Sequence, residues 1–311
     1  ESCQKIHENR IFYILINKNI MNKVEKAVFP VAGMGTRLLP ATKASSKEML
    51  PIVDKPLIQY AVEEAIAAGI TELIFITGRT KRSITDHFDK AYELESQLER
   101  NGELEKLEIV RNIIPDGVTC IFIRQAEPLG LGHAVLCAKP VIGDQPFVVL
   151  LPDDLIDDGN HGVTKQLVDI FQQKGKSIIA VEHVIKEDVS KYGIVDVSAT
   201  KDKSLTEVTG IFEKPKPGES PSTLGVIGRY ILTSRIFDCL EKTSTGVGNE
   251  VQLTDAIRIL LDKESVYAYE FEGTRYDCGS KLGYMQASIQ YALKDPDIKE
   301  EFFEYIKGLK I

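Results

Sequence analysis

The sequence predicts an α/β fold in which a mixed, mainly parallel sheet lies between two layers of helices. The first observation is a series of short, β-branched, nearly continuous apolar runs, which are typical of strands buried on both faces. The second is that helical patterns, several of them ending at glycine, stand between these runs. The third is a mostly helical pattern after Ser234, which predicts helices at the C-terminal end.

The expected elements follow in chain order. Apolar runs predict strands at 26–31, 72–77, 119–124, 147–151, 177–184 and 207–212. Apolar residues at helical spacing predict helices at 57–68, 132–138, 164–173, 235–240, 251–262, 282–292 and 298–309. A stretch rich in Glu, Leu and Lys at 92–108 predicts a solvated helical excursion, broken at Asn101-Gly102. The last two helices have apolar faces that need a partner, either the sheet or another subunit.

Composition fits a globular protein with an ample core, since 43% of the 311 residues are hydrophobic. The formal net charge at pH 7 is −8, and no basic run is longer than two residues. This balance argues against a nucleic-acid partner. An acidic chain that binds an anionic ligand must gather its positive charge locally.

We expect a single domain over 21–311, with 1–20 an upstream extension or an artefact, because Met21 precedes the first expected strand. The apolar run at 11–16 is too short for a signal peptide or a membrane span, so no membrane association is expected. The odd number of cysteines and the absence of a C-x-x-C motif favour a reducing cytoplasm over disulfides or zinc.

The glycine turn after the first expected strand is the most informative feature. The chain there reads VFPVAGMGTRLLPATKASSKEMLPIVDKP. Gly33 and Gly35, followed by Thr36, let backbone N–H groups approach a phosphate closely, because no Cβ blocks the way. Arg37 and Lys47 can then bring full positive charge to the same polyphosphate. The segment therefore predicts a grip for a nucleoside triphosphate.

Two other phosphate loops do not fit this turn. A dinucleotide loop needs G-x-G-x-x-G, but Leu38 stands at the third glycine position. Pro40 follows where a helix should already be running. A Walker A loop fails too, because the chain has no G-x-x-x-x-G-K-[ST] sequence.

Acidic residues end two apolar runs that lie far apart in the sequence. Asp153 and Asp154 follow LLP, and Asp277 lies in RYDCG. Ligands of open α/β sheets bind beyond the carboxyl ends of strands, and Mg²⁺ prefers hard oxygen ligands. The alternative is that these aspartates only start loops or turns.

The chain resembles the sugar-1-phosphate nucleotidyltransferases from about residue 26 to about residue 292. The resemblance rests on the order and spacing of GMGTRLLPAT, SKEMLP, DKPLIQY, QAEPLGLGHAV, LLPDD, YGIV, EKP, EVQLTDAI and RYDCGSKLGYMQA. It implies a Rossmann-like α/β/α nucleotidyltransferase fold. It also implies nucleotide-binding, sugar-binding and C-terminal helical parts at about 26–155, 156–280 and 281–311.

Within this family the resemblance implies a Mg²⁺-dependent reaction of UTP with glucose 1-phosphate that gives UDP-glucose and pyrophosphate. The residues it implies for the uracil pocket are Ala32, Gly33, Glu48, Gln125 and Gly130. Glu48 can accept from uracil N3–H, and the amide of Gln125 can both donate and accept.

The resemblance also implies residues for the metal and the sugar. It makes Asp153 and Asp277 the metal ligands. For the sugar it implies Asp154, Gly193, Glu213 and Gly225, with Arg229 a weaker candidate. Lys214 is expected to bridge the sugar phosphate and the α-phosphate of the nucleotide.

The expected chemistry needs no protein nucleophile, because the second pKa of a phosphate ester is about 6 and the sugar phosphate already carries two negative charges. Catalysis should therefore consist of positioning and charge neutralisation, with Arg37, Lys47 and Lys214 as the cations. A thymidylyltransferase or another hexose specificity is the near alternative, and a non-catalytic sugar-nucleotide sensor is the remote one. We also expect a homodimer or homotetramer.

Overall fold

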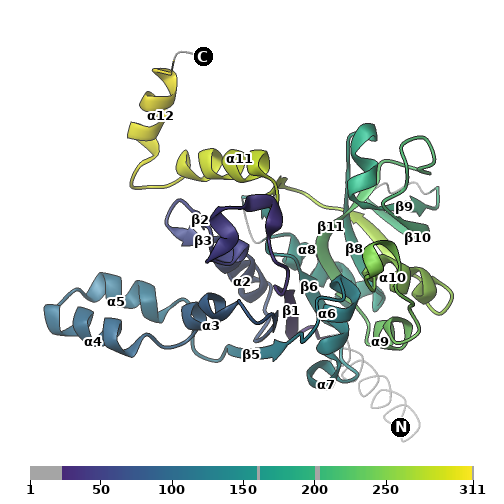
Figure 1. The fold of residues 1–311 in the computed structure, drawn as a ribbon, viewed down its shortest axis with the longest axis horizontal. Coiled ribbons are helices and arrows are strands. Elements are labelled where there is room, and N and C mark those ends of the chain that lie inside the picture. The colour runs from purple at the N-terminus through teal and green to yellow at the C-terminus, as the bar shows by residue number, and fades with distance from the viewer. Residues whose placement is uncertain (1–22, 160–161, 200–203, 310–311) are drawn as a thin grey trace, which may run out of the picture.

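The computed structural model describes residues 23–159, 162–199 and 204–309. The expected extension at 1–20 lies outside these ranges. Within them the central sheet has nine strands in the order β5-β4-β1-β6-β11-β8-β12-β10-β9 (Figure 1). The strands are β1 (Lys26–Pro30), β4 (Glu72–Thr77), β5 (Thr119–Arg124), β6 (Phe147–Leu150), β8 (Ile178–His183), β9 (Gly193–Val197), β10 (Leu205–Glu213), β11 (Leu224–Leu232) and β12 (Tyr267–Glu270).

The sheet is mixed, as predicted. Strands β5, β4, β1 and β6 pair in parallel, and so do β8 and β12. Strand β11 runs antiparallel to both β6 and β8, and β10 runs antiparallel to β12 and β9. The antiparallel share is therefore larger than the sequence indicated. All nine residues of β11 are buried. A strand buried on both faces has the continuous apolar pattern that is typical of parallel sheets, although β6 and β8 on either side run antiparallel to β11.

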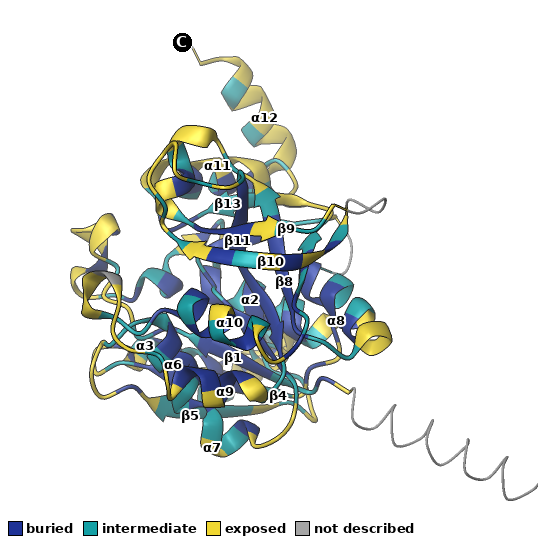
Figure 2. Ribbon diagram, turned by 90° about the vertical axis from the view of Figure 1, so that its right-hand side faces the viewer, coloured by how far each residue is buried: buried dark blue, intermediate teal, exposed yellow. Residues whose placement is uncertain are grey.

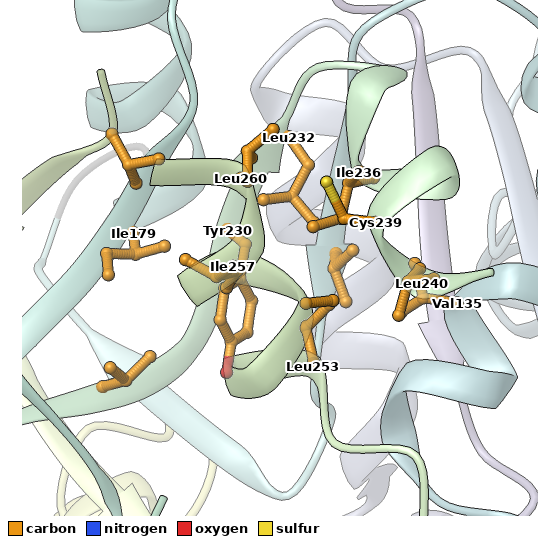
Figure 3. Close-up of a cluster of buried hydrophobic side chains, with 14 of the residues drawn as sticks. Val135, Ile179, Tyr230, Leu232, Ile236, Cys239, Leu240, Leu253, Ile257 and Leu260 are labelled. Carbon is orange, nitrogen blue, oxygen red and sulfur yellow. The ribbon is translucent and has the colours of Figure 1, made fainter. Parts of the chain in front are cut away.

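Helices cover both faces of the sheet. On one face, α2 (Leu57–Ala67), α3 (Arg82–Phe88) and α8 (Val163–Lys174) pack against alternate strand residues such as Phe29 and Phe75. On the other face, α6 (Leu131–Cys137), α9 (Arg235–Leu240) and α10 (Leu253–Leu261) pack against the intervening residues, such as Val28 and Ile74. Figure 3 shows part of this second core, where Tyr230 and Leu232 of β11 lie near Ile257 and Leu260 of α10. Helix α7 (Lys139–Ile142) follows α6.

Two helical pairs stand away from the sheet (Figure 1). The predicted excursion forms α4 (Tyr92–Asn101) and α5 (Leu104–Arg111), and Gly102 ends α4 in a left-handed conformation with φ +71°. The second pair is α11 (Lys281–Ala292) and α12 (Lys299–Lys307). No residue of α12 is buried in this chain, as its colours in Figure 2 show. None of the helices in the described ranges is long and apolar enough to cross a membrane.

Short elements build the edge of the sheet where the site lies. The chain after β1 makes 3₁₀ turns at Thr36–Leu38, Ala41–Lys43 and Lys47–Met49, followed by the small hairpin of β2 (Pro51–Ile52) and β3 (Lys55–Pro56). Strand β7 (Asp154–Asp157) pairs antiparallel with β13 (Thr274–Asp277). This pairing brings the two acidic segments predicted from the sequence side by side.

Candidate active site

A cavity of about 620 Å³ opens beside β11, where the chain leaves β1 and β6. Several residues predicted from the sequence line it: Arg37, Asp153, Asp154, Gly193, Glu213, Lys214 and Asp277. These residues come from both the expected nucleotide half and the expected sugar half of the chain. The fold therefore joins the two halves at a single concave site, as a transfer between two substrates requires.

The carboxylates of Asp153 and Asp277 converge at Gly279. A Cβ built on Gly279 would lie 3.0 Å from Asp277 Oδ1 and 3.1 Å from Asp153 Oδ2. The backbone supports this approach, because the N–H of Cys278 donates to the carbonyl of Asp153 at 2.8 Å. The sequence predicted the two aspartates but not the glycine that leaves them room.

The ammonium group of Lys47 lies 2.6 Å from Asp153 Oδ2. Burial acts to raise the pKa of Asp153. The charge and hydrogen bond of Lys47, with smaller contributions from a backbone hydrogen bond and from Arg275, outweigh burial, so that pKa lies below its ordinary value. Gly35, at φ +67°, packs against Lys47: a Cβ there would lie 3.1 Å from Lys47 Cβ. The glycine turn and the lysine segment therefore fold onto one another, and the exposed side chain of Arg37 faces the same cavity.

Asp153 and Asp277 fit a magnesium ion that is shared with phosphate. Their oxygens are hard ligands, and Mg²⁺ usually takes one or two carboxylates together with substrate phosphates and water. Within the described ranges, no group of three or more His, Cys, Asp or Glu side chains could hold a metal by itself. Two converging carboxylates beside Lys47 and Arg37 are therefore a donor set that would need a polyphosphate to complete it.

Ala32 and Gln125, two of the residues predicted for the base, follow β1 and β5, which lie on either side of β4 in the sheet. Ala32 follows β1 and lies against Gly78 after β4, since a Cβ on Gly78 would lie 3.1 Å from the Ala32 carbonyl oxygen. Gln125 follows β5 and donates its backbone N–H to Thr77 at 2.9 Å. Gly33 is exposed, with no atom within 4 Å of the position of a Cβ. Gly33 thus leaves its backbone open, whereas Gly78 is crowded by Ala32.

Gly130 needs to be glycine. Its φ is +97°, and a Cβ would lie 2.6 Å from Glu250 Cβ. Its carbonyl oxygen accepts from Gln125 Nε2 at 3.2 Å. Thr36, which begins the first 3₁₀ turn, is exposed. Neither Gly130 nor Thr36 lines the cavity.

Glu48 lies in a buried ion pair. Its Oε2 accepts from Lys81 Nζ at 2.8 Å, and the two side chains are 1% and 3% exposed. Burial raises the pKa of Glu48, with Lys81 opposing that effect. Glu48 does not line the cavity, so its contact with a base stays a prediction.

Asp154 is already paired within the protein. Its Oδ1 lies 2.6 Å from Arg275 Nε, and its Oδ2 accepts from the N–H of Gly228 at 2.9 Å. Arg275 also donates to Glu182 at 2.8 Å, and its guanidinium lies 5.2 Å from the ring centre of Tyr192. Both oxygens of Asp154 therefore have partners, and a sugar would meet the Asp154–Arg275 pair rather than a free carboxylate.

The predicted sugar side is built around Thr254 of α10. Thr254 Oγ1 donates to Glu213 Oε2 at 2.8 Å, and a Cβ on Gly193 would lie 2.6 Å from Thr254 Cγ2. Lys214 Nζ lies 3.0 Å from Glu213 Oε1. The backbone of Lys214 has φ +46°, and its N–H donates to Tyr192 at 2.9 Å. Lys214 is thus held at the cavity by its own backbone.

Two predicted sugar residues lie elsewhere. A Cβ on Gly225 would lie 2.7 Å from Val184 Cγ1, and Gly225 does not line the cavity, so close packing accounts for this glycine. The prediction that Arg229 contacts sugar is wrong, because its side chain is 1% exposed and forms a buried ion pair with Glu64. It also donates to the carbonyl oxygens of Leu151 and Asp154, at 3.1 and 3.0 Å. Arg229 therefore stabilises the turn at 151–154, which carries Asp153 and Asp154.

Comparison with known proteins assigns this site to a family. The model of the family described as nucleotidyl transferase matches residues 26–294. The chain belongs to this family. It is 50% identical over 291 residues to the UTP–glucose-1-phosphate uridylyltransferase of Staphylococcus epidermidis, with 94% of this chain and 100% of that protein covered.

Two solved structures are similar over most of the chain. The UTP-bound UGPase of Acinetobacter baumannii is 44% identical with a TM-score of 0.86, covering 93% of this chain and 100% of that one. A UDP-glucose pyrophosphorylase complexed with UDP-glucose is 45% identical with a TM-score of 0.79, covering 88% and 100%. The nucleotidyltransferase fold predicted from the sequence is therefore confirmed.

Several residues of this nucleotidyltransferase site were not predicted. Among those that line the cavity are Lys191, Tyr192, Gly228, Tyr230, Glu250, Gln252, Thr254 and Arg275. Tyr192 and Arg275 lie in the YGIV and RYDCG motifs, so attention to the neighbours of each motif could have found them. Thr254 likewise lies in the EVQLTDAI motif, so the same attention could have found it.

Proposed function

We propose that this protein catalyses the magnesium-dependent reaction of UTP with α-D-glucose 1-phosphate, which gives UDP-glucose and pyrophosphate. The observation that supports it most is that Arg37, Asp153, Asp277 and Lys214 line one cavity, and that Lys47 lies 2.6 Å from Asp153 beside it. Two polyanions can meet only where charge of the opposite sign is concentrated. The identity with a named uridylyltransferase supports the choice of substrates.

The chain's own residues bind and orient the two phosphates in this mechanism. Asp153 and Asp277 would hold Mg²⁺, which supplies charge neutralisation at the phosphates when it is bound. Lys47 would exchange its contact with Asp153 for one with the polyphosphate, and Arg37 would bind the leaving pyrophosphate. Lys214 would hold the sugar phosphate beside the α-phosphate, so that its oxygen attacks in line.

A matrix of triphosphates and sugar 1-phosphates, assayed for pyrophosphate release, tests this function. We expect UTP with glucose 1-phosphate to be the best pair, dTTP to be used weakly, and CTP and purine triphosphates poorly. For dTTP, the extra methyl group in a tight pocket costs only about 1–3 kcal/mol. For CTP, N3 of cytosine would face an acceptor of the protein, and each of the two buried acceptors left without a donor costs about 1–3 kcal/mol. A dTTP rate equal to that of UTP would favour the thymidylyltransferase alternative. Binding of UDP-glucose without any turnover would favour the sensor.

Substitution of Lys214 by Ala is expected to raise the KM for glucose 1-phosphate and to lower kcat, about tenfold or more in kcat/KM. The reason is that one cation between two phosphates is lost, and a hydrogen bond to a charged group is worth about 1.5–3 kcal/mol. Lys216→Ala is the matched control, because Lys216 is exposed and does not line the cavity. Equal kcat/KM values for the two variants would show that Lys214 is only part of a surface loop.

We further propose that the protein is cytoplasmic and forms a homodimer or homotetramer. The cysteines at 120, 137, 239 and 278 are free in the structure, which suits a reducing compartment. Large apolar side chains are exposed on α11 and α12, among them Leu282, Met285 and Phe303, and a second subunit would cover them.

A further inference from the structure

The amide of Gln125 is held in one orientation by Gly130 and His133. Nε2 lies 3.2 Å from the carbonyl oxygen of Gly130 and 2.9 Å from Nδ1 of His133, which is the third residue of α6. A carbonyl oxygen only accepts hydrogen bonds, so the end of the amide beside Gly130 is the NH₂ group. The second N–H then points at His133 Nδ1. That nitrogen must accept, and the imidazole carries its proton on Nε2.

The oxygen of the amide remains available. Gln125 Oε1 has no hydrogen bond to another described residue. In the described ranges, every side-chain nitrogen or oxygen that is closed off from solvent does have a partner. Oε1 therefore reaches solvent, although the residue as a whole is only 6% exposed. With both N–H groups used inside the protein, Gln125 presents an acceptor and no donor.

Glu48 is the other acceptor that the sequence suggested for uracil N3–H, and its situation differs. Its Oε2 is bonded to Lys81, and both side chains are almost completely buried. Gln125 follows β5 and has an accessible oxygen. Neither residue lines the cavity. Both N–H groups of Gln125 are used within the protein, so its oxygen is the atom left to accept from a base.

We propose that His133 is a positioning residue, whose Nδ1 fixes the amide of Gln125 with Oε1 toward the pyrimidine edge and so favours a base with an N3–H. The inference rests on the proposed function, because it takes UTP as the nucleotide. Uracil carries a proton at N3, whereas N3 of cytosine is an acceptor. When the acceptor at His133 is removed, one of the two bonds that orient the amide is lost, and the NH₂ end can turn toward the base more readily.

Two substitutions of His133 separate orientation from packing. His133→Asn keeps an acceptor, because Oδ1 of Asn can take the place of Nδ1, whereas His133→Leu removes it. We would measure kcat/KM for UTP and CTP with glucose 1-phosphate, and the Kd of each nucleotide by calorimetry. The UTP-to-CTP ratio should fall about fivefold in His133→Leu, the value of one net hydrogen bond, and stay near wild type in His133→Asn.

The control acts on Gln125 itself. Gln125→Glu removes both N–H donors, so it should alter the same ratio. A merely structural role for His133 would weaken UTP and CTP binding equally and leave the ratio unchanged in both His133 variants, which would overturn the proposal. An unchanged ratio in Gln125→Glu would also overturn it. Failure of the proposed function would be seen separately, as absence of turnover in the wild type, and the calorimetric ratio would still test His133.

Discussion

Replacing Asp153 by Asn is expected to lower kcat by about a hundredfold or more while the fold stays intact. The substitution keeps the shape of the side chain and removes its charge. Asp153 Oδ2 is both the partner of Lys47, at 2.6 Å, and one of the two oxygens that meet beside Gly279. Without that charge, the proposed magnesium site has one carboxylate left. The side chains of Asp153 and Lys47 are 27% and 22% exposed, so water can solvate the lysine that is left unpaired.

The experiment compares Asp153→Asn with Asp238→Asn, a charge-neutralising change on an exposed residue of α9. Steady-state rates are measured against magnesium concentration, and circular dichroism checks the fold. Asp238→Asn should behave as wild type. Near-normal activity of Asp153→Asn, or of the wild type in excess EDTA, would rule out the proposed role of the metal.

Replacing Arg229 by Met is expected to lower the free energy of unfolding by about 3–5 kcal/mol. The substitution leaves the carboxylate of Glu64, at 8% exposure, with its bonds to Thr164 but without its countercharge. It also removes the donors to the carbonyl oxygens of Leu151 and Asp154. The turn that carries Asp153 and Asp154 therefore loses two hydrogen bonds, and activity should fall together with stability.

Urea unfolding of Arg229→Met is compared with that of Arg235→Met. Arg235 is 61% exposed and lies 3.9 Å from Glu264, so its loss should cost less than about 1 kcal/mol. The double variant Arg229→Met with Glu64→Leu should recover part of the loss, because the buried carboxylate is gone as well. A loss below about 1 kcal/mol in Arg229→Met would mean that the ion pair contributes little to the native state.

The elements that periodicity defines could be predicted from the sequence. The expected strands at 72–77 and 119–124 agree with β4 and β5 at both ends, and the expected helix at 235–240 agrees with α9. The local apolar pattern is enough to predict these elements, because the apolar residues within each one are those that it buries in the core. Asp153, Asp277 and Lys214 were predicted because each stands in a motif, and the fold brings all three to one cavity.

Other parts of the site depend on contacts between distant segments. Arg275 pairs with Asp154, 121 residues away, and Lys81 pairs with Glu48, 33 residues away. A single sequence gives no sign of which charges will meet. Arg229 was misjudged for the same reason, because a charged residue in a buried strand can face a cavity or a buried partner. The antiparallel pairing of β11 with β6 and β8 likewise depends on how the chain connects these strands. The apolar residues of β11 do not reveal its direction.

The central claim is that the uridylyl group passes directly between the two substrates, with no covalent bond to the protein. UTP with sulfur at the α-phosphorus in one defined configuration tests it, and the configuration of the UDP-glucose product is read by phosphorus NMR. A single in-line displacement predicts inversion at the α-phosphorus. Net retention would require two displacements through a nucleotidyl-enzyme intermediate, and would contradict the account.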